Sequence, residues 1–439
     1  MIEANTSPCR LLACSALLAM TLMQPANAQD AQSATAAQRG ASGPASASSA
    51  AAGEAGPTVR PEIGNPLLDA QRLIGEKNTK DAADRISAAE AVTNKTPYEL
   101  HVLALLKGAL ASALGDADLA AQQYELASQG PWLKQADKVA RLQAIVALYY
   151  NAKNYGKTIE WIAKYQQAGG DNPALRTVLA QSYYLNADYA NAAKAFEIEI
   201  GNATSAGKVP TEMQLKLLAD SRGRTKDPAG YTRAVESLVS YYPSQANWRT
   251  LMARLWARPG LSNRLQLDVF RLQLASVGLS DETDYTEMAA LALQEGSAIE
   301  ANKLLEQGYA AGVLVASDKA IELKRLTDKA SKSAAEDRNT LEKDVARAKN
   351  LPDGLAMFNY GFNLFQLGQA ERGVAQMEQA LAKGIARNSD LLKLRLVAAY
   401  AKLDQRNKAT ELLGALAGKT EPVGFDDCVR YWQLYLKHP

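Results

Sequence analysis

The segment ALRTVLAQSYYLNADYANAAKAFEIEI, residues 174–200, has the pattern of two short helices joined by a tight turn. In its first half, Leu179, Ala180 and Tyr183 lie on one helical face. Asn and Asp at 186–188 favour a turn between the helices. The second half repeats small and large apolar side chains at helical spacing, namely Tyr189, Ala192 and Phe196. Small residues allow two helices to touch closely, and large ones fill the space between neighbouring pairs, so a repeated helical hairpin is predicted.

The same pattern recurs over most of residues 62–420. It resembles the tetratricopeptide repeat (TPR), a helix-turn-helix unit of about 34 residues. The whole chain is also similar to exported proteobacterial TPR-containing proteins of unassigned function. The resemblance implies an all-α fold in which helix-turn-helix repeats stack into a right-handed superhelix, an α-solenoid. It also implies a scaffold with a concave groove, lined by the first helix of each unit, that binds other proteins or peptides.

The N-terminal region has the composition of an export signal and a linker. The apolar run at 11–23 is too short to span a membrane, and small residues precede Gln29 at a cleavage-like site. Cys14 offers the alternative of a lipid anchor, although most of the apolar run follows it. Residues 29–61 are rich in Ala, Ser and Gly, which favours disorder. We therefore expect a cleaved, periplasmic protein with no transmembrane segment.

The remaining sequence divides into repeats, one charged segment and a terminal helix. The expected organisation is a signal peptide (1–28), a linker (29–61), six TPR-like units (62–312), a charged helical insertion or irregular repeat (313–352), two further units (353–420) and a capping helix (421–439). Within the six units, 211–242 is irregular because its turn at 224–230 is too long, although Asp227 and Pro228 are typical of a helix N-cap and first turn. For the charged segment, a hairpin that breaks near Lys332 is favoured over one long helix, and its charges are interpreted as a solvated face.

Composition argues against most chemistry. The chain has 49 Lys and Arg against 47 Asp and Glu, so it carries no strong positive charge for nucleic acid. Only two His residues occur, His101 on a helix face and His438 near the end, which disfavours His-based catalysis. After residue 28 the only cysteine is Cys428, interpreted as a small buried side chain rather than an intermolecular disulfide. No zinc, calcium or phosphate-loop motif is present, since GNATSAGKV (201–209) lacks the required spacing. We expect no metal and no cofactor.

Side chains one position beyond the packing positions are candidates for a protein-binding groove. One group is the aromatic stripe Phe358, Phe362 and Phe365, whose helix is apolar nearly all round. That helix is either buried on both sides, by the charged segment or a neighbour, or exposes an aromatic surface to a ligand. A second group combines tyrosines with amides and a hydroxyl: Gln143, Tyr150, Thr177, Gln181 and Tyr184. These suit hydrogen bonding to an extended peptide, but the two tyrosines could equally extend the core between repeats.

Three functions remain open from the sequence. The leading hypothesis is an exported TPR scaffold that binds a protein or peptide of the cell envelope and performs no catalysis. The second is an enzyme or accessory factor of peptidoglycan or polysaccharide metabolism. The third is a self-associating structural array, a homo-oligomer.

Overall fold

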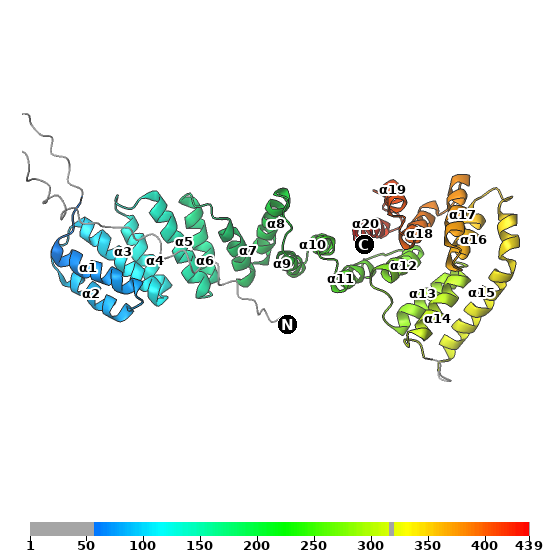
Figure 1. The fold of residues 1–439 in the computed structure, drawn as a ribbon, viewed down its shortest axis with the longest axis horizontal. Helices are drawn as coiled ribbons and strands as arrows, with labels where there is room; N and C mark the ends of the chain where they lie inside the picture. The colour runs from blue at the N-terminus through cyan, green and yellow to red at the C-terminus, as the bar shows by residue number, and fades with distance from the viewer. Residues whose placement is uncertain (1–56, 316–319, 439) are drawn as a thin grey trace, which may run out of the picture. The chain divides into compact units, whose positions relative to one another are not determined.

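The computed structural model describes residues 57–315 and 320–438, and that part of the chain is made of α-helices, one short 3-10 helix and turns, without strands (Figure 1). Most helices pack in antiparallel pairs that are adjacent in sequence. The prediction of an all-α helical-repeat fold is confirmed. The expected signal peptide lies outside the described residues, as does nearly all of the expected linker. No helix among the described residues is long and apolar enough to cross a membrane.

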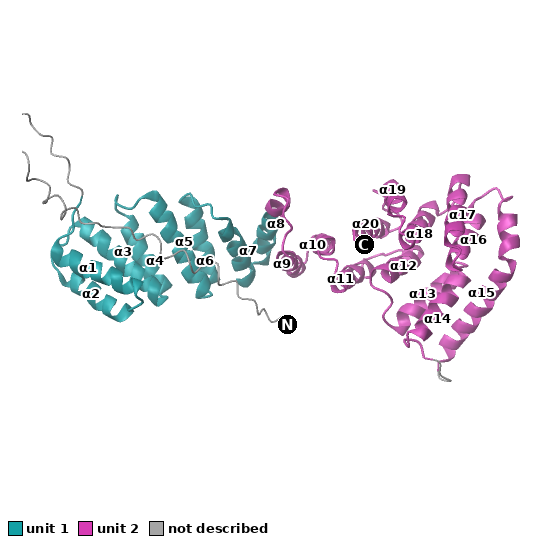
Figure 2. Cartoon of the chain, in the orientation of Figure 1, with its two compact units in different colours: residues 1–199 teal, residues 200–439 magenta. Residues whose placement is uncertain are grey.

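The chain divides into two compact units, residues 1–199 and 200–439 (Figure 2). Unit 1 contains α1 (Pro61–Gly75), α2 (Thr79–Ala91), α3 (Pro97–Leu114), α4 (Ala117–Ser128), α5 (Gln135–Asn151), α6 (Tyr155–Gln167), α7 (Pro173–Leu185) and most of α8 (Tyr189–Ser205). Its main contacts join neighbours in sequence, and first helices also contact the next first helix, as α1 contacts α3 and α3 contacts α5. The buried side chains form one continuous core that runs from Ile63 to Val178.

Unit 2 contains the remaining helices. They are α9 (Glu212–Arg224), α10 (Pro228–Tyr241), α11 (Gln245–Trp256), η1 (Asn263–Leu265), α12 (Gln266–Ser276), α13 (Glu282–Gln294), α14 (Ala298–Ala310), α15 (Ile321–Ala348), α16 (Leu355–Gln366), α17 (Ala370–Lys383), α18 (Ser389–Lys402), α19 (Arg406–Leu416) and α20 (Phe425–Lys437). Residues 62–312 therefore hold seven helix pairs, α1 to α14, where six units were expected.

Eight helix pairs share one turn geometry. A single residue with positive φ stands just before the N-cap of the second helix: Lys77, Gly115, Lys153, Ala187, Lys226, Gly296, Gly368 or Asp404. The next backbone N–H bonds to a carbonyl five residues earlier, as Asp188 N bonds to Tyr183 O at 2.9 Å. This bond satisfies a carbonyl at the end of the first helix. The helix pairs thus repeat the conformation of the turn as well as the spacing of apolar residues.

The expectation of an irregular segment at 211–242 is corrected by this turn. Helix α9 ends at Arg224 and α10 begins at Pro228, with Lys226 in the shared conformation. Asp227 caps α10, because its carboxylate accepts a hydrogen bond from Gly230 N at 2.8 Å. The sequence placed this cap correctly but extended the turn too far.

The charged segment forms one helix, so the favoured hairpin was wrong. Helix α15 is 28 residues long and continues through Lys332. Its buried side chains are a single stripe, with Leu323 and Ala330 in the core around α13 and α14, and Leu341 and Val345 against Leu364 of α16. Because this stripe keeps helical spacing through the middle of the segment, nothing favours a break there.

The C-terminal helix packs more widely than a cap over the last repeat. Helix α20 contacts α18 and α19, the helices of the last repeat, and also α10 and α12. Its side chains are buried around nearly the whole circumference, including Phe425, Cys428, Tyr431 and Trp432. Helix α12 also contacts α18. Helices that are far apart in the sequence therefore pack against one another within unit 2.

Candidate functional site

The predicted tyrosine and amide residues of unit 1 lie on two successive first helices. Gln143 and Tyr150 belong to α5, and Thr177, Gln181 and Tyr184 belong to α7, and all five are half-buried. The hydroxyl of Tyr150 donates to Oε1 of Gln181 at 2.9 Å, which joins the two helices. The structure therefore brings members of this set together across a repeat boundary.

Neighbouring side chains brace these residues. The ring of Tyr150 meets Tyr155 edge-on, with centroids 5.9 Å apart, and Tyr184 meets Tyr189 in the same way at 5.5 Å. By contrast, the adjacent Tyr149 is buried and donates its hydroxyl to Asp118 at 2.6 Å. Tyr150 and Tyr184 thus keep part of their surface in solvent while their orientation is fixed. We call the five predicted residues the unit 1 face.

The aromatic stripe on α16 is buried. Phe358 has no exposed surface, and Phe362 and Phe365 are nearly as enclosed. Phe358 therefore cannot contact a ligand in this conformation, which corrects its assignment to an open groove. Of the two alternatives for this helix, burial on both sides holds for Phe358. Phe362 and Phe365 still line a pocket of unit 2.

Two arginines rather than the charged segment enclose Phe362. The guanidinium carbons of Arg271 on α12 and Arg395 on α18 lie 5.1 Å and 5.3 Å from the centre of its ring. Such contacts are favourable because the face of an aromatic ring is negative. Helix α15 instead packs on Leu364 and Tyr360, on another side of α16.

Arg271 is the centre of a buried charge cluster that the sequence did not predict. It donates to Asp268 at 2.7 Å and to both oxygens of Glu300 at 2.9 Å and 2.7 Å. Arg395 donates to Glu295 at 3.1 Å, and its burial lowers the pKa of its guanidinium. Asp268 and Arg271 are close in sequence, as are Glu295 and Glu300, but these pairs and Arg395 come from distant parts of the chain and share no local sequence signal.

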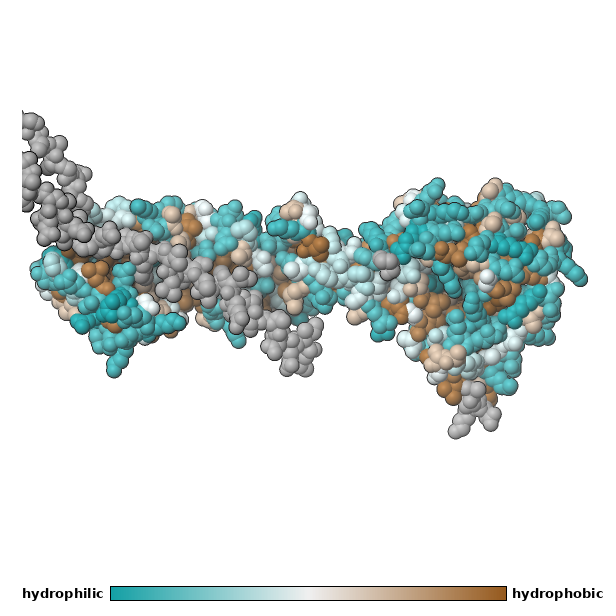
Figure 3. Space-filling view, viewed as in Figure 1, coloured by the Kyte–Doolittle hydropathy of each residue, from teal (hydrophilic) through white to brown (hydrophobic). Residues whose placement is uncertain are grey.

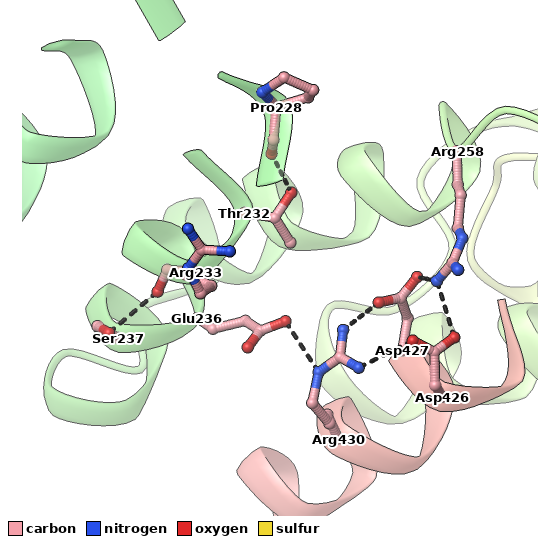
Figure 4. A network of polar contacts seen from close by, with 9 residues as sticks. All are labelled: Pro228, Thr232, Arg233, Glu236, Ser237, Arg258, Asp426, Asp427 and Arg430. Carbon is pink, nitrogen blue, oxygen red and sulfur yellow. Dashed lines mark hydrogen bonds and ion pairs between the residues drawn. The ribbon is translucent and has the colours of Figure 1, made fainter. Parts of the chain in front are cut away.

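A second network ties α20 to α10 and the end of α11 (Figure 4). Arg258 pairs with Asp426 at 2.8 Å and with Asp427. Arg430 pairs with both aspartates and with Glu236 of α10, the last at 3.3 Å. Burial raises the pKa of Glu236, although Arg430 opposes that shift. We call these five residues the α20 latch.

His101 and Cys428 are both enclosed by neighbouring side chains. His101 is buried and does not lie on an exposed helix face. Its Nδ1 hydrogen bonds with the Ala127 carbonyl at 2.9 Å, and its ring packs against Tyr98 and Trp132. Burial also lowers the pKa of His101. Cys428 is fully buried on α20, as expected, and burial raises the pKa of its thiol. Among residues 57–315 and 320–438, no group of His, Cys, Asp and Glu could hold a metal ion.

Comparison with known proteins adds no identification, since no protein-family model and no curated protein matches the chain.

Proposed function

We propose that the chain is a TPR-type binding protein that holds an extended segment of a partner protein on the unit 1 face and performs no catalysis. The observation that carries this proposal is the row of half-buried tyrosine and amide side chains on α5 and α7, linked by the bond from Tyr150 to Gln181. Within the proposal, the expected signal peptide makes the compartment the periplasm and the partner an envelope protein or peptide.

The chemistry of the unit 1 face suits a peptide backbone. An extended peptide offers alternating N–H donors and C=O acceptors at its edge. Gln181 uses its carbonyl oxygen in the bond with Tyr150, so its amide nitrogen is oriented to donate to a peptide carbonyl. The exposed parts of the Tyr150 and Tyr184 rings provide apolar contact area without a large loss of side-chain freedom, because neighbouring rings already hold them.

The contrast with unit 2 also supports the choice of unit 1. In unit 2, α20 packs against α10, α12 and α18, so helices from distant parts of the chain cover one another's surfaces. In the described part of unit 1, the main contacts connect only helices that are close in sequence. Figure 3 shows a largely hydrophilic surface with scattered hydrophobic residues on the face in view, so a large apolar patch is not the basis of the proposal.

The test is selection of ligands followed by mutation. Residues 29–439 would be screened against an unbiased library of displayed peptides, and the dissociation constant of a selected peptide measured by fluorescence anisotropy. Tyr150→Ala with Tyr184→Ala is expected to weaken binding about tenfold or more. The double variant Gln143→Ala with Gln181→Ala, which alters the core less, is also expected to weaken binding of the peptide.

The matched control is Gln122→Ala with Gln166→Ala. Both glutamines are exposed and belong to the second helices α4 and α6. This variant should bind as the unchanged chain does. Failure to select any peptide, or equal affinity in all variants, would reject the unit 1 face as the binding site. Circular dichroism melting identifies any variant that has lost its fold.

A further inference from the structure

Unit 2 contains a pocket of about 290 Å³ where five helices meet. Its wall comes from α12, α14, α16, α18 and α20. This volume lies near the lower limit of small-molecule pockets, which span about 300–1,000 Å³. The pocket is separate from the unit 1 face, so its occupant is a question independent of peptide binding.

The inner wall of the pocket is apolar and aromatic. Phe362 and Phe365 from α16 lie in a stacked arrangement with ring centres 6.2 Å apart. Leu304 of α14 and Trp432 of α20 are buried beside them in the lining. These side chains are fixed by packing from several helices, so the apolar part of the lining is preformed.

The polar side of the pocket has two lysines. Lys303 of α14 is half-buried and donates to the carbonyl oxygen of Gln366 at 3.0 Å. Lys402 of α18 lies with its ammonium 6.0 Å from the centre of the Phe365 ring. The two charges repel each other, and burial together with this repulsion lowers the pKa of Lys303. An anion between them would relieve both effects.

The other charged groups of the lining are already neutralised. Both oxygens of Glu300 accept hydrogen bonds from Arg271, and the attraction of Glu300 for Lys303 only partly opposes the lowering of the pKa of that lysine. Arg271 in turn is held by Asp268 as well. Among the charged side chains that line the pocket, Arg271, Lys303 and Lys402 are cationic and Glu300 is acidic, so the lining has an excess of positive charge.

We propose that this pocket binds a small carboxylate joined to an apolar chain or ring, with the carboxylate between Lys303 and Lys402 and the apolar part against Phe362 and Phe365. The negative charge of the carboxylate matches the excess of positive charge in the lining. The apolar part removes aromatic surface from water, while two ammonium groups can each donate to one carboxylate oxygen. A free carboxylic acid and the last residue of a peptide share this chemistry.

The test is isothermal titration calorimetry on residues 29–439. The probes are octanoate, 3-phenylpropanoate, an acetylated tripeptide ending in phenylalanine, and 1-octanol as the uncharged counterpart of octanoate. The acids are expected to bind and the alcohol to bind at least about tenfold more weakly, since a charge-assisted hydrogen bond is lost. Comparing the free acids with the tripeptide distinguishes the two sources.

Variants locate the site. Lys303→Met and Lys402→Met keep the length of the side chain without its charge, and each is expected to weaken acid binding about tenfold or more. Ala398→Phe, which fills the pocket from α18 without changing any charge, is expected to abolish it. Lys343→Met is the control, because Lys343 is exposed on α15 and outside the pocket.

The outcomes separate clearly. Acid binding that is lost in the pocket variants and retained in Lys343→Met supports the proposal. No binding of any acid at millimolar concentration overturns it, as does equal affinity for octanoate and 1-octanol. Acid binding that survives both lysine substitutions and Ala398→Phe places the ligand elsewhere and also overturns it. Each variant is first shown to melt as the unchanged chain does.

Discussion

Unit 1 and unit 2 are built from the same helical hairpin but use it differently. In unit 1, the shared turn at Lys77, Gly115, Lys153 and Ala187 joins pairs that pack on their sequence neighbours. In unit 2, the pair α11 and α12 lacks that turn and has Pro259, Gly260 and the short helix η1 instead. Helix α12 consequently contacts α18 and α20, far along the chain. The altered connection between α11 and α12 thus accompanies a change from packing between sequence neighbours, in unit 1, to packing between distant helices, in unit 2.

The two units also differ in where they keep their charges. Among its described residues, from 57 onward, unit 1 has one fully buried carboxylate, Glu99, which pairs with a half-exposed arginine, Arg60. Unit 2 buries Asp268, Arg271 and Glu300 together. A buried cluster specifies a geometry but contributes less net stability than its short distances suggest, because each ion loses its hydration. We therefore expect stability in unit 2 to depend mainly on the apolar side chains of α20.

The largest expected effect is from Trp432→Ala. Trp432 is almost completely buried on α20, and loss of a large aromatic side chain from a core costs about 3–5 kcal/mol. Hydrogen exchange should show lost protection in α10, α12, α18 and α20, with α1 to α7 unchanged. Cys428, the only thiol after residue 28, should also become reactive towards a thiol reagent. Equal loss of protection in both units would mean that their stabilities are not separate.

The variant Glu99→Gln tests how the stability of unit 1 depends on pH. Glu99 accepts hydrogen bonds from the backbone and side chain of Arg60 and from Thr96 N, and the bond from the Arg60 side chain is the main cause that lowers its pKa to about 2. Because the folded-state pKa is below the ordinary value, its stabilising contribution is complete above about pH 4.5 and is lost as pH falls towards 2.

Urea unfolding of the chain and of Glu99→Gln should therefore differ at pH 7 and converge in acid. The loss should appear in α1 and α3, since Arg60 precedes α1 and Glu99 lies in the first turn of α3. A difference that stays constant between pH 7 and pH 2 would show that ionisation of Glu99 is not its source.

Arg430→Met tests the α20 latch. Arg430 is 42% exposed, so solvent screens its pairs with Glu236, Asp426 and Asp427, and the expected loss of unfolding free energy in unit 2 is about 1 kcal/mol. The unchanged chain should approach the variant in stability at high salt. An effect as large as that of Trp432→Ala would mean that charge, rather than apolar burial, holds α20 in place.

The smallest effect is expected from Tyr150→Phe. The substitution keeps the ring against Tyr155 and removes only the hydroxyl that donates to Gln181. Thermal melting should shift by the equivalent of about 0.5–1.5 kcal/mol in unit 1, the usual net value of one hydrogen bond. No change in melting together with retained peptide binding would mean that this bond does not organise the unit 1 face.

Local pattern was sufficient to predict the helices. The spacing of Leu179, Ala180 and Tyr183 and the turn at 186–188 predicted α7 and α8, and Asp227 correctly indicated the start of α10. The prediction of a hairpin failed for α15. A single helix and a hairpin would show the same apolar spacing on either side of Lys332, so that spacing did not distinguish them. Neither Gly nor Pro lies there to favour a turn, and the apolar stripe packs on α14 and α16 along a continuous helix.

The sites were less predictable than the fold, because they depend on contacts between distant residues. The pairing of Tyr150 with Gln181 follows from the repeat length, so these residues could be proposed from sequence. Arg271 and Glu300 are 29 residues apart, and Arg395 joins them only because α12 contacts α18. Phe358 carried the same apolar signal as Phe362, and sequence alone could not distinguish full burial from a place in the lining of a pocket.

Helix α15 has a further consequence for the length of the chain. Its N-terminal half packs with α13 and α14 and its C-terminal half with α16, with no turn between them in which a change of length could be absorbed. Each residue of an α-helix turns about 100° around the axis, so one inserted residue near Lys332 would rotate Leu341 and Val345 away from Leu364. Loops elsewhere in such a chain can change in length. The length of α15 cannot, because its two halves must keep the same rotation about the helix axis for both to stay packed.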